Sequence, residues 1–190
     1  MKLFQSSAVA CVITFAALCM LSPSVANAQR RDYMTEAEIE LVRDAQDIDQ
    51  RIDILSKIID RRFTAAGIDP GGFAVQKKAE DKWGTAPTGS RLELLNDIRF
   101  LLQKAIDDID DVSEHNANAQ TQNRTEGLLF PKAVRLLAAA ARRYQKILKA
   151  LADKNTNEKQ RGVILASLSM CDEIIEAAAK LPPDKTKTKS

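Results

Sequence analysis

The chain has 190 residues, of which 45% are hydrophobic, 28% are charged and only 5% are aromatic. This balance is typical of a folded, helix-rich protein and excludes a disordered chain, because enough aliphatic residues are present to form a core. The 28 lysine and arginine residues nearly cancel the 26 aspartate and glutamate residues, which leaves a formal net charge of +2. We therefore expect no nucleic-acid partner, since such proteins carry a clustered basic surface.

The first 28 residues are typical of a secretory signal peptide. Lys2 supplies a positive charge, residues 8–21 form an uncharged apolar run, and Ala26 and Ala28 occupy the −3 and −1 positions of a signal-peptidase site. The apolar run is shorter than the roughly 20 residues that a membrane-spanning helix needs, which favours a cleaved signal over an anchor. We expect an exported protein, periplasmic or extracellular, with no membrane span after cleavage.

Cleavage would leave Cys171 as the single cysteine, because Cys11 and Cys19 lie in the signal. One cysteine cannot crosslink its own chain, so a disulfide-stapled scaffold is excluded. Cys171 lies between Leu168 and Ile175 in an apolar pattern, which favours a buried free thiol. A disulfide to a second chain is the alternative.

Four segments of the mature chain repeat apolar residues at spacings of three and four, as amphipathic helices do. The first two begin with capping boxes, in which a hydroxyl and a glutamate satisfy unpaired backbone N–H groups. The boxes pair Thr35 with Glu38 and Ser90 with Glu93. The four expected helices span residues 35–66, 90–115, 131–153 and 158–181.

The first of these helices is expected to be the longest. Three glutamates near its start, Glu38 among them, and Arg61 with Arg62 in its last turn suit the helix dipole. Gly67 is the expected C-cap. At a rise of 1.5 Å per residue, a continuous helix over residues 35–66 would be about 48 Å long. Its apolar seam consists of Leu41, Ala45, Ile48, Ile52, Leu55 and Ile59.

The segments between the helices are expected to be loops, because no strand-like alternation occurs. Phe73 and Trp83 would anchor an ordered loop over residues 68–89, and residues 116–127 form a polar loop. The pattern predicts an all-α four-helix bundle whose last two helices are antiparallel neighbours. The expected organisation is a signal peptide at 1–28, one domain at 29–181 and a flexible lysine-rich tail at 182–190.

An acidic cluster near the end of the second expected helix is the main candidate for ligand binding. Asp111 and His115 are four residues apart, so both could contact one ion from the same helical face. A di-iron bundle needs two Glu-x-x-His units, and the chain has none. The acidic side chains also lie opposite the apolar seam, which favours a solvated surface. The candidate residues for holding a metal or small ligand are Asp107, Asp111, Glu114 and His115.

No catalytic motif is present in the sequence. It lacks a G-x-S-x-G elbow, a glycine-rich phosphate loop and a Cys-x-x-Cys-His haem site. Haem held by His115 with Met34 or Met170 is disfavoured, because the histidine lies at a helix end. Paired-carboxylate hydrolysis stays open, although few aromatic residues are available to line a cleft. We expect no catalytic residue, no cofactor and no enzyme activity.

Two apolar residues outside the seam of the first helix, Ile39 and Ile54, indicate an interaction face. Excess length with a near-heptad pattern is how a helix reaches a partner chain. The alternative is that the loop over residues 68–89 packs over the projecting end of this helix. The stretch over residues 37–49 (AEIELVRDAQDID) resembles uncharacterised exported helical proteins of environmental bacteria, a resemblance that implies no activity and no site residues. We expect a non-catalytic helical-bundle protein that acts through a protein partner or self-association, with metal or small-ligand binding as the alternative.

Overall fold

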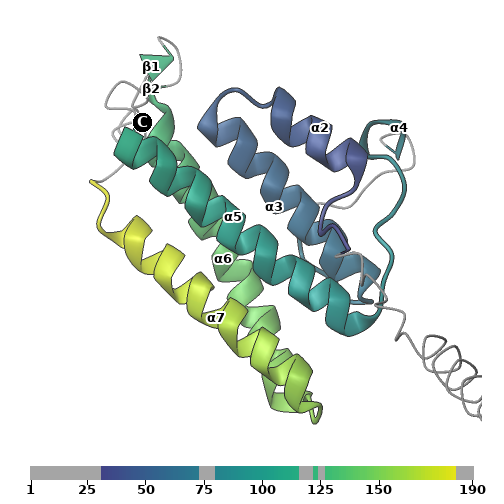
Figure 1. Ribbon diagram of the computed structural model, residues 1–190. Helices are drawn as coiled ribbons and strands as arrows, with labels where there is room; N and C mark the ends of the chain where they lie inside the picture. The colour runs from purple at the N-terminus through teal and green to yellow at the C-terminus, as the bar shows by residue number, and fades with distance from the viewer. Residues whose placement is uncertain (1–30, 73–79, 116–121, 124–126, 183–190) are drawn as a thin grey trace, which may run out of the picture. The chain divides into compact units, whose positions relative to one another are not determined.

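Helices account for nearly all regular structure in the computed structural model, which describes residues 31–72, 80–115, 122–123 and 127–182 (Figure 1). The expected all-α class is confirmed. The signal peptide with Ala26 and Ala28, the loop residue Phe73 and the tail beyond Pro182 lie outside the described residues. The helices are α2 (Glu36–Asp44), α3 (Ile48–Ala65), α4 (Glu80–Trp83), α5 (Arg91–His115), α6 (Leu129–Lys154) and α7 (Glu158–Ala179).

The first expected helix is two helices, which corrects the prediction of one continuous helix over residues 35–66. Ala45 and Asp47 both adopt extended backbone, with ψ angles of 95° and 138°, and this ends α2 and starts α3. The side chain of Arg51 stabilises the break by donating two hydrogen bonds, of 3.2 and 3.1 Å, to the Ala45 carbonyl. No glycine or proline marks the break, so the apolar spacing alone did not indicate it.

Four of the longer helices pack as a ring in which α3 contacts α5, α5 contacts α7, α7 contacts α6 and α6 contacts α3. Helix α2 folds back along α3 on the outside of this ring (Figure 1). The described part of the chain therefore has five helices longer than one turn, where the sequence predicted four. The expected antiparallel pairing of the last two helices is confirmed by side-chain hydrogen bonds from Gln145 to Asp172 and from Arg135 to the Pro182 carbonyl.

The core is formed by aliphatic side chains of α3, α5, α6 and α7. Tyr144 is fully buried, and its hydroxyl donates a 2.9 Å hydrogen bond to the Ser56 carbonyl. Alanines of α6 allow its neighbours to approach closely. The residues buried most completely in α3 and α5 are Ile52, Leu55, Ile58, Ile59, Phe63, Ile98, Leu101, Leu102 and Ala105.

Burial along α6 drifts away from the expected seam. The spacing of Ala133, Leu137, Ala140 and Tyr144 predicts that Ile147 and Leu151 continue the buried seam. Both are only half-buried, whereas Leu148 and Ala152 are buried. A straight helix has 3.6 residues per turn, so a seam predicted at 3.5 drifts by about 20° per heptad. The coiled-coil-like period is therefore too short for this helix.

Other local predictions have mixed outcomes. The second capping box is confirmed, since Ser90 N–H donates to Glu93 and Glu93 N–H to Ser90 Oγ. Trp83 is buried, as expected of a loop anchor, although it ends the short helix α4. Two-residue strands β1 (Gln122–Asn123) and β2 (Gly127–Leu128) pair antiparallel where only loop was expected. Over the described residues, no helix combines the length and the apolar character that crossing a membrane requires.

A proline scan of α2 and α3 tests the break. Asp47→Pro should change the free energy of unfolding by less than about 1 kcal/mol, because the φ of Asp47 is −85° and its side chain makes no capping hydrogen bond. Asp53→Pro should cost about 3 kcal/mol or more, because Asp53 lies inside α3. Urea denaturation measures both. Equal losses in the two variants would contradict the break and favour a continuous helix.

Candidate functional site

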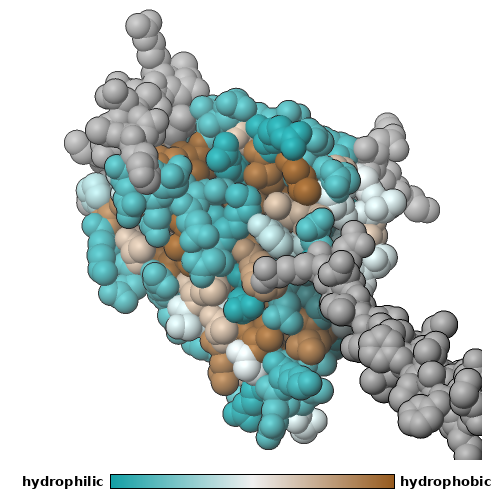
Figure 2. All heavy atoms as spheres, viewed as in Figure 1, coloured by the Kyte–Doolittle hydropathy of each residue, from teal (hydrophilic) through white to brown (hydrophobic). Residues whose placement is uncertain are grey.

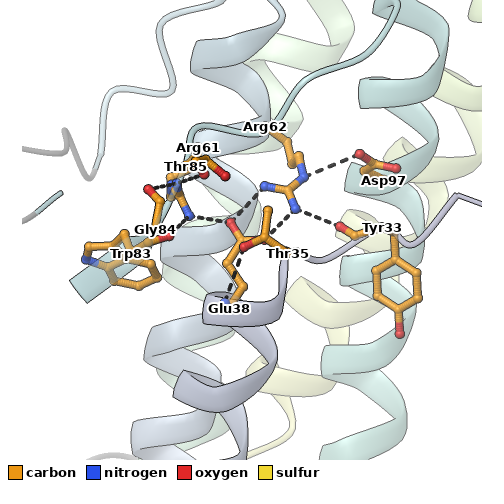
Figure 3. A network of polar contacts seen from close by, with 9 residues as sticks. All are labelled: Tyr33, Thr35, Glu38, Arg61, Arg62, Trp83, Gly84, Thr85 and Asp97. Atoms are coloured by element: carbon orange, nitrogen blue, oxygen red, sulfur yellow. Dashed lines mark hydrogen bonds and ion pairs between the residues drawn. The ribbon is translucent and has the colours of Figure 1, made fainter. Parts of the chain in front are cut away.

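The most highly charged part of the interior is a buried ion network of Glu38, Arg61, Arg62 and Asp97 (Figure 3). Glu38 is central, with Oε1 at 2.5 Å from Arg61 Nη1 and Oε2 at 2.5 Å from Arg62 Nη2. Arg62 Nε lies 3.3 Å from an Asp97 oxygen. The four side chains are each 5% exposed or less. Two positive and two negative charges balance, which is the condition under which buried ions are tolerated.

The two arginines also bind backbone carbonyls from distant segments. Arg61 donates to the carbonyls of Trp83 and Thr85 at 3.0 and 2.8 Å, and Arg62 donates to that of Tyr33 at 2.7 Å. These bonds join the segment before α2 and the segment after α4 to the end of α3 (Figure 3). Because planar guanidinium groups carry five N–H donors, they suit such multiple contacts.

The local sequence determines how Glu38 reaches this position. Thr35 caps α2, and the Glu38 carboxylate accepts a 2.9 Å hydrogen bond from the Thr35 N–H while it binds the arginines. Gly84 brings the loop close to α2, since a Cβ there would lie 2.7 Å from the Ala37 Cβ. Gly84 also has a φ of +63°, which favours glycine.

Burial lowers the pKa of the Arg61 guanidinium from its usual value. The opposite charge of Glu38 raises the pKa of Arg61 and so opposes this lowering. The like charge of Arg62 lowers the pKa further, because like charges disfavour each other's charged form. Arginine stays protonated even so. With its charges paired and its side chains closed to solvent, the network stabilises the fold and presents no group to a substrate.

Two further ion pairs connect α3 to α6. Arg143 Nη1 lies 3.3 Å from buried Asp60 and donates a 3.0 Å hydrogen bond to the Pro70 carbonyl. Lys132 lies 2.7 Å from buried Asp49. Each pair has one half-exposed cation that neutralises a buried carboxylate, so both are structural contacts.

A cleft of about 180 Å³ lies between α5, α6 and α7. Buried Val134, Leu137 and Ile174 form its apolar base, and exposed Asp110 and Glu173 bring carboxylates to its mouth from α5 and α7. Figure 2 shows hydrophobic surface between hydrophilic side chains where α5 and α7 lie side by side. The other lining residues are Ile106, Ile109, Phe130, Ala177 and Leu181.

The cleft lies where α7 ends short of the first turn of α6. Helix α7 ends at Ala179, before Pro182, two residues earlier than expected. The hydrogen bond from Arg135 to Pro182 places this end beside the second turn of α6. Phe130 in the first turn of α6 therefore extends past the last turn of α7, and its apolar surface is left half-buried.

The structure places three of the four predicted metal candidates outside this cleft. Asp107, Asp111 and Glu114 are exposed and do not line the cleft, and Asp107 accepts a 2.8 Å hydrogen bond from Gln103. The side chain of His115 lies outside the described residues. Among the side chains that are described, no three His, Cys, Asp or Glu groups converge to hold an ion. The metal hypothesis stays a prediction.

The predicted interaction residues do not share one helix. Ile39 lies on α2 and Ile54 on α3, and both are half-buried. Ile54 packs against the core. The premise of an unusually long first helix is therefore wrong, while an interaction through Ile39 stays a prediction.

Cys171 is free and fully buried, which confirms the expected buried thiol. Burial, with a smaller contribution from Asp172, raises the pKa of the thiol to about 12. Because the thiolate is the reactive form, this cysteine is a poor nucleophile at neutral pH. A disulfide to a second chain would require the core to open.

Sequence reasoning missed the ion network because it assigned Glu38, Arg61 and Arg62 to the helix dipole. A signal was present: continuing the spacing of the apolar seam places Glu38 just before Leu41 and Arg62 just after Ile59. Opposite charges at the two ends of one apolar seam can pair only if the helix breaks and its two halves lie side by side. The cleft had no comparable signal, since it depends on where α7 ends relative to α6.

Substitution of Glu38 tests the network. Glu38→Gln should lower the free energy of unfolding by about 3–5 kcal/mol, because two buried arginines lose their shared carboxylate. Glutamine retains the capping box, so the loss reports on the ion pairs. The matched control is Glu40→Gln, whose partner Arg43 is exposed, and it should change stability by less than about 1 kcal/mol. Similar losses in both variants, measured by chemical denaturation, would rule out a central role for Glu38.

Comparison with protein-family models, with curated proteins and with solved structures gives no match for this chain. The resemblance of residues 37–49 to exported helical proteins therefore stays a prediction. The cleft and the ion network must be interpreted from their own chemistry.

Proposed function

We propose that this protein is an exported, non-catalytic binding protein that takes a small, largely apolar ligand in the cleft between α5, α6 and α7. The observation that carries the proposal is the cleft itself, with its apolar base and two carboxylates at its mouth. The sequence predicts small-ligand binding at the exposed acidic cluster as an alternative function. The proposal keeps a small ligand but places it in the cleft. Asp110, which lies beside that cluster in the sequence, lines the cleft.

The shape and lining of the cleft support a ligand that is mostly hydrocarbon. Ile106, Ile109 and Phe130 are half-buried around the cavity, so an apolar ligand would remove further apolar surface from water. Such burial is worth about 25 cal/mol per Å². At about 180 Å³ the cleft is smaller than drug-sized sites of roughly 300–1,000 Å³. A single short alkyl chain fits this volume, whereas a haem does not.

Export forms the second part of the proposal. The charged start, apolar run and Ala26-x-Ala28 site support removal of residues 1–28, which would place the mature protein in the periplasm or outside the cell. The mature protein would begin at Gln29, and N-terminal sequencing of the exported protein tests this. In this proposal α3, α5, α6 and α7 form a four-helix bundle, and α2 is an accessory helix.

Filling the cleft tests ligand binding. Octanol should bind the parent protein, as measured by calorimetry, and Ala177→Trp should weaken binding at least about tenfold, because the indole would occupy the apolar space. Ala177 lines the cleft and is exposed, so the substitution should leave the fold intact. Ala179→Trp is the matched control on the same helix, outside the cleft lining. Undetectable octanol binding by the parent, or equal binding by both variants, would reject the site.

A protein partner or a second copy of the chain on α2 is the other candidate function. Ile39 is half-buried on the outermost helix and does not belong to the core cluster of the described residues, which favours a contact there. Ile54 packs against the core and is less suited to such a contact.

Light scattering tests the candidate contact on α2. The parent should have the mass of a dimer, and Ile39→Glu should convert it to a monomer, because a charge at an apolar contact is costly to bury. Leu165→Glu, at a 49% exposed position on α7, should leave the dimer unchanged. A monomeric parent would exclude self-association through Ile39.

A further inference from the structure

We infer that the ligand of the cleft is a cationic amphiphile, an alkyl chain that carries an ammonium group. The inference rests on the proposed function and adds the chemical class of the ligand. It depends on how the two carboxylates of the cleft are placed and on whether other groups neutralise them.

Asp110 and Glu173 reach the cleft from different helices, α5 and α7, and both are exposed at its mouth. Within the described residues, neither carboxylate has a hydrogen bond or an ion pair. The other acidic residues nearby differ: Asp108 is paired with Lys104, and Glu176 with Lys180. Two carboxylates beside one apolar cavity favour a positive group there, since an opposite charge within about 4–6 Å stabilises the ionised form.

Among the described residues, no cation of the protein forms an ion pair with Asp110 or Glu173. Arg135 on α6 lies close to the cleft, but its guanidinium donates to the Pro182 carbonyl. The tail over residues 183–190 contains three lysines, yet it has no bulky apolar side chain to fill the cavity. A ligand with both an alkyl chain and an ammonium group complements the apolar base and the acidic mouth together.

A comparison of three eight-carbon probes tests the inference with the full-length mature protein. Calorimetric titration with octylammonium, octanol and octanoate holds the alkyl chain constant and changes only the head-group charge. Octylammonium should bind at least about fivefold more tightly than octanol, as expected for exposed charge pairs. Octanoate should bind most weakly of the three. The preference for octylammonium should shrink at high salt, because screening weakens interactions between exposed charges.

Charge-neutral variants identify the groups responsible. Asp110→Asn combined with Glu173→Gln should make the affinities for octylammonium and octanol equal within about twofold. Asp153→Asn is the control, since it removes an exposed charge at the other end of α6 and should leave the preference intact. A preference that survives the double substitution would overturn the assignment.

The outcomes separate the inference from the proposed function. If octanol binds and octylammonium binds no more tightly, the cationic assignment is wrong while the apolar site stands. If none of the three probes binds, the proposed function itself fails. If replacing Lys185, Lys187 and Lys189 by serine raises the octylammonium affinity more than about tenfold, the tail is the resident cation and the assignment to a free ligand is overturned.

Discussion

The charge of Glu38 is the constraint on which the first half of the structure depends. A carboxylate closed to solvent must be neutralised, and Arg61 and Arg62 do this from 23 and 24 residues further along the chain. In a continuous helix these residues would be about 35 Å apart, at a rise of 1.5 Å per residue. The ion pairs at 2.5 Å therefore require α2 to reverse direction, and the break over Ala45–Asp47 is the point at which it does so.

The same network determines the course of the segments around it. Arg61 has N–H donors left after it binds Glu38, and buried donors must be satisfied. The carbonyls of Trp83 and Thr85 accept hydrogen bonds from these donors. As a result Trp83 is held in the core, with the centroid of its ring 5.6 Å from the Arg61 Cζ. Loss of Glu38 would thus affect the loop before α5 as well as α2.

The sequence predicts those features of the fold that depend on local spacing. The capping boxes, the extent of α5 and the antiparallel pairing of α6 with α7 follow from periodicity, caps and a short turn. The break between α2 and α3 could not be predicted in this way. It depends on the contact of Glu38 with the distant Arg61 and Arg62, and no glycine or proline marks it. The drift of burial from Ile147 to Leu148 reflects the difference between a 3.5- and a 3.6-residue period.

The candidate cleft was unpredictable for a related reason, since it arises from the relative lengths of packed helices. Each helix of the trio α5, α6 and α7 has an ordinary amphipathic pattern, and no single segment contains the site. The cavity forms because α7 ends at Ala179, while Phe130 and Val134 of α6 continue beyond it. Extending α7 past Pro182 would cover the half-buried Phe130, so the early end of the helix leaves the cleft open. A cleft of this kind needs no sequence motif, so its chemistry must be deduced from the side chains that the three helices expose together.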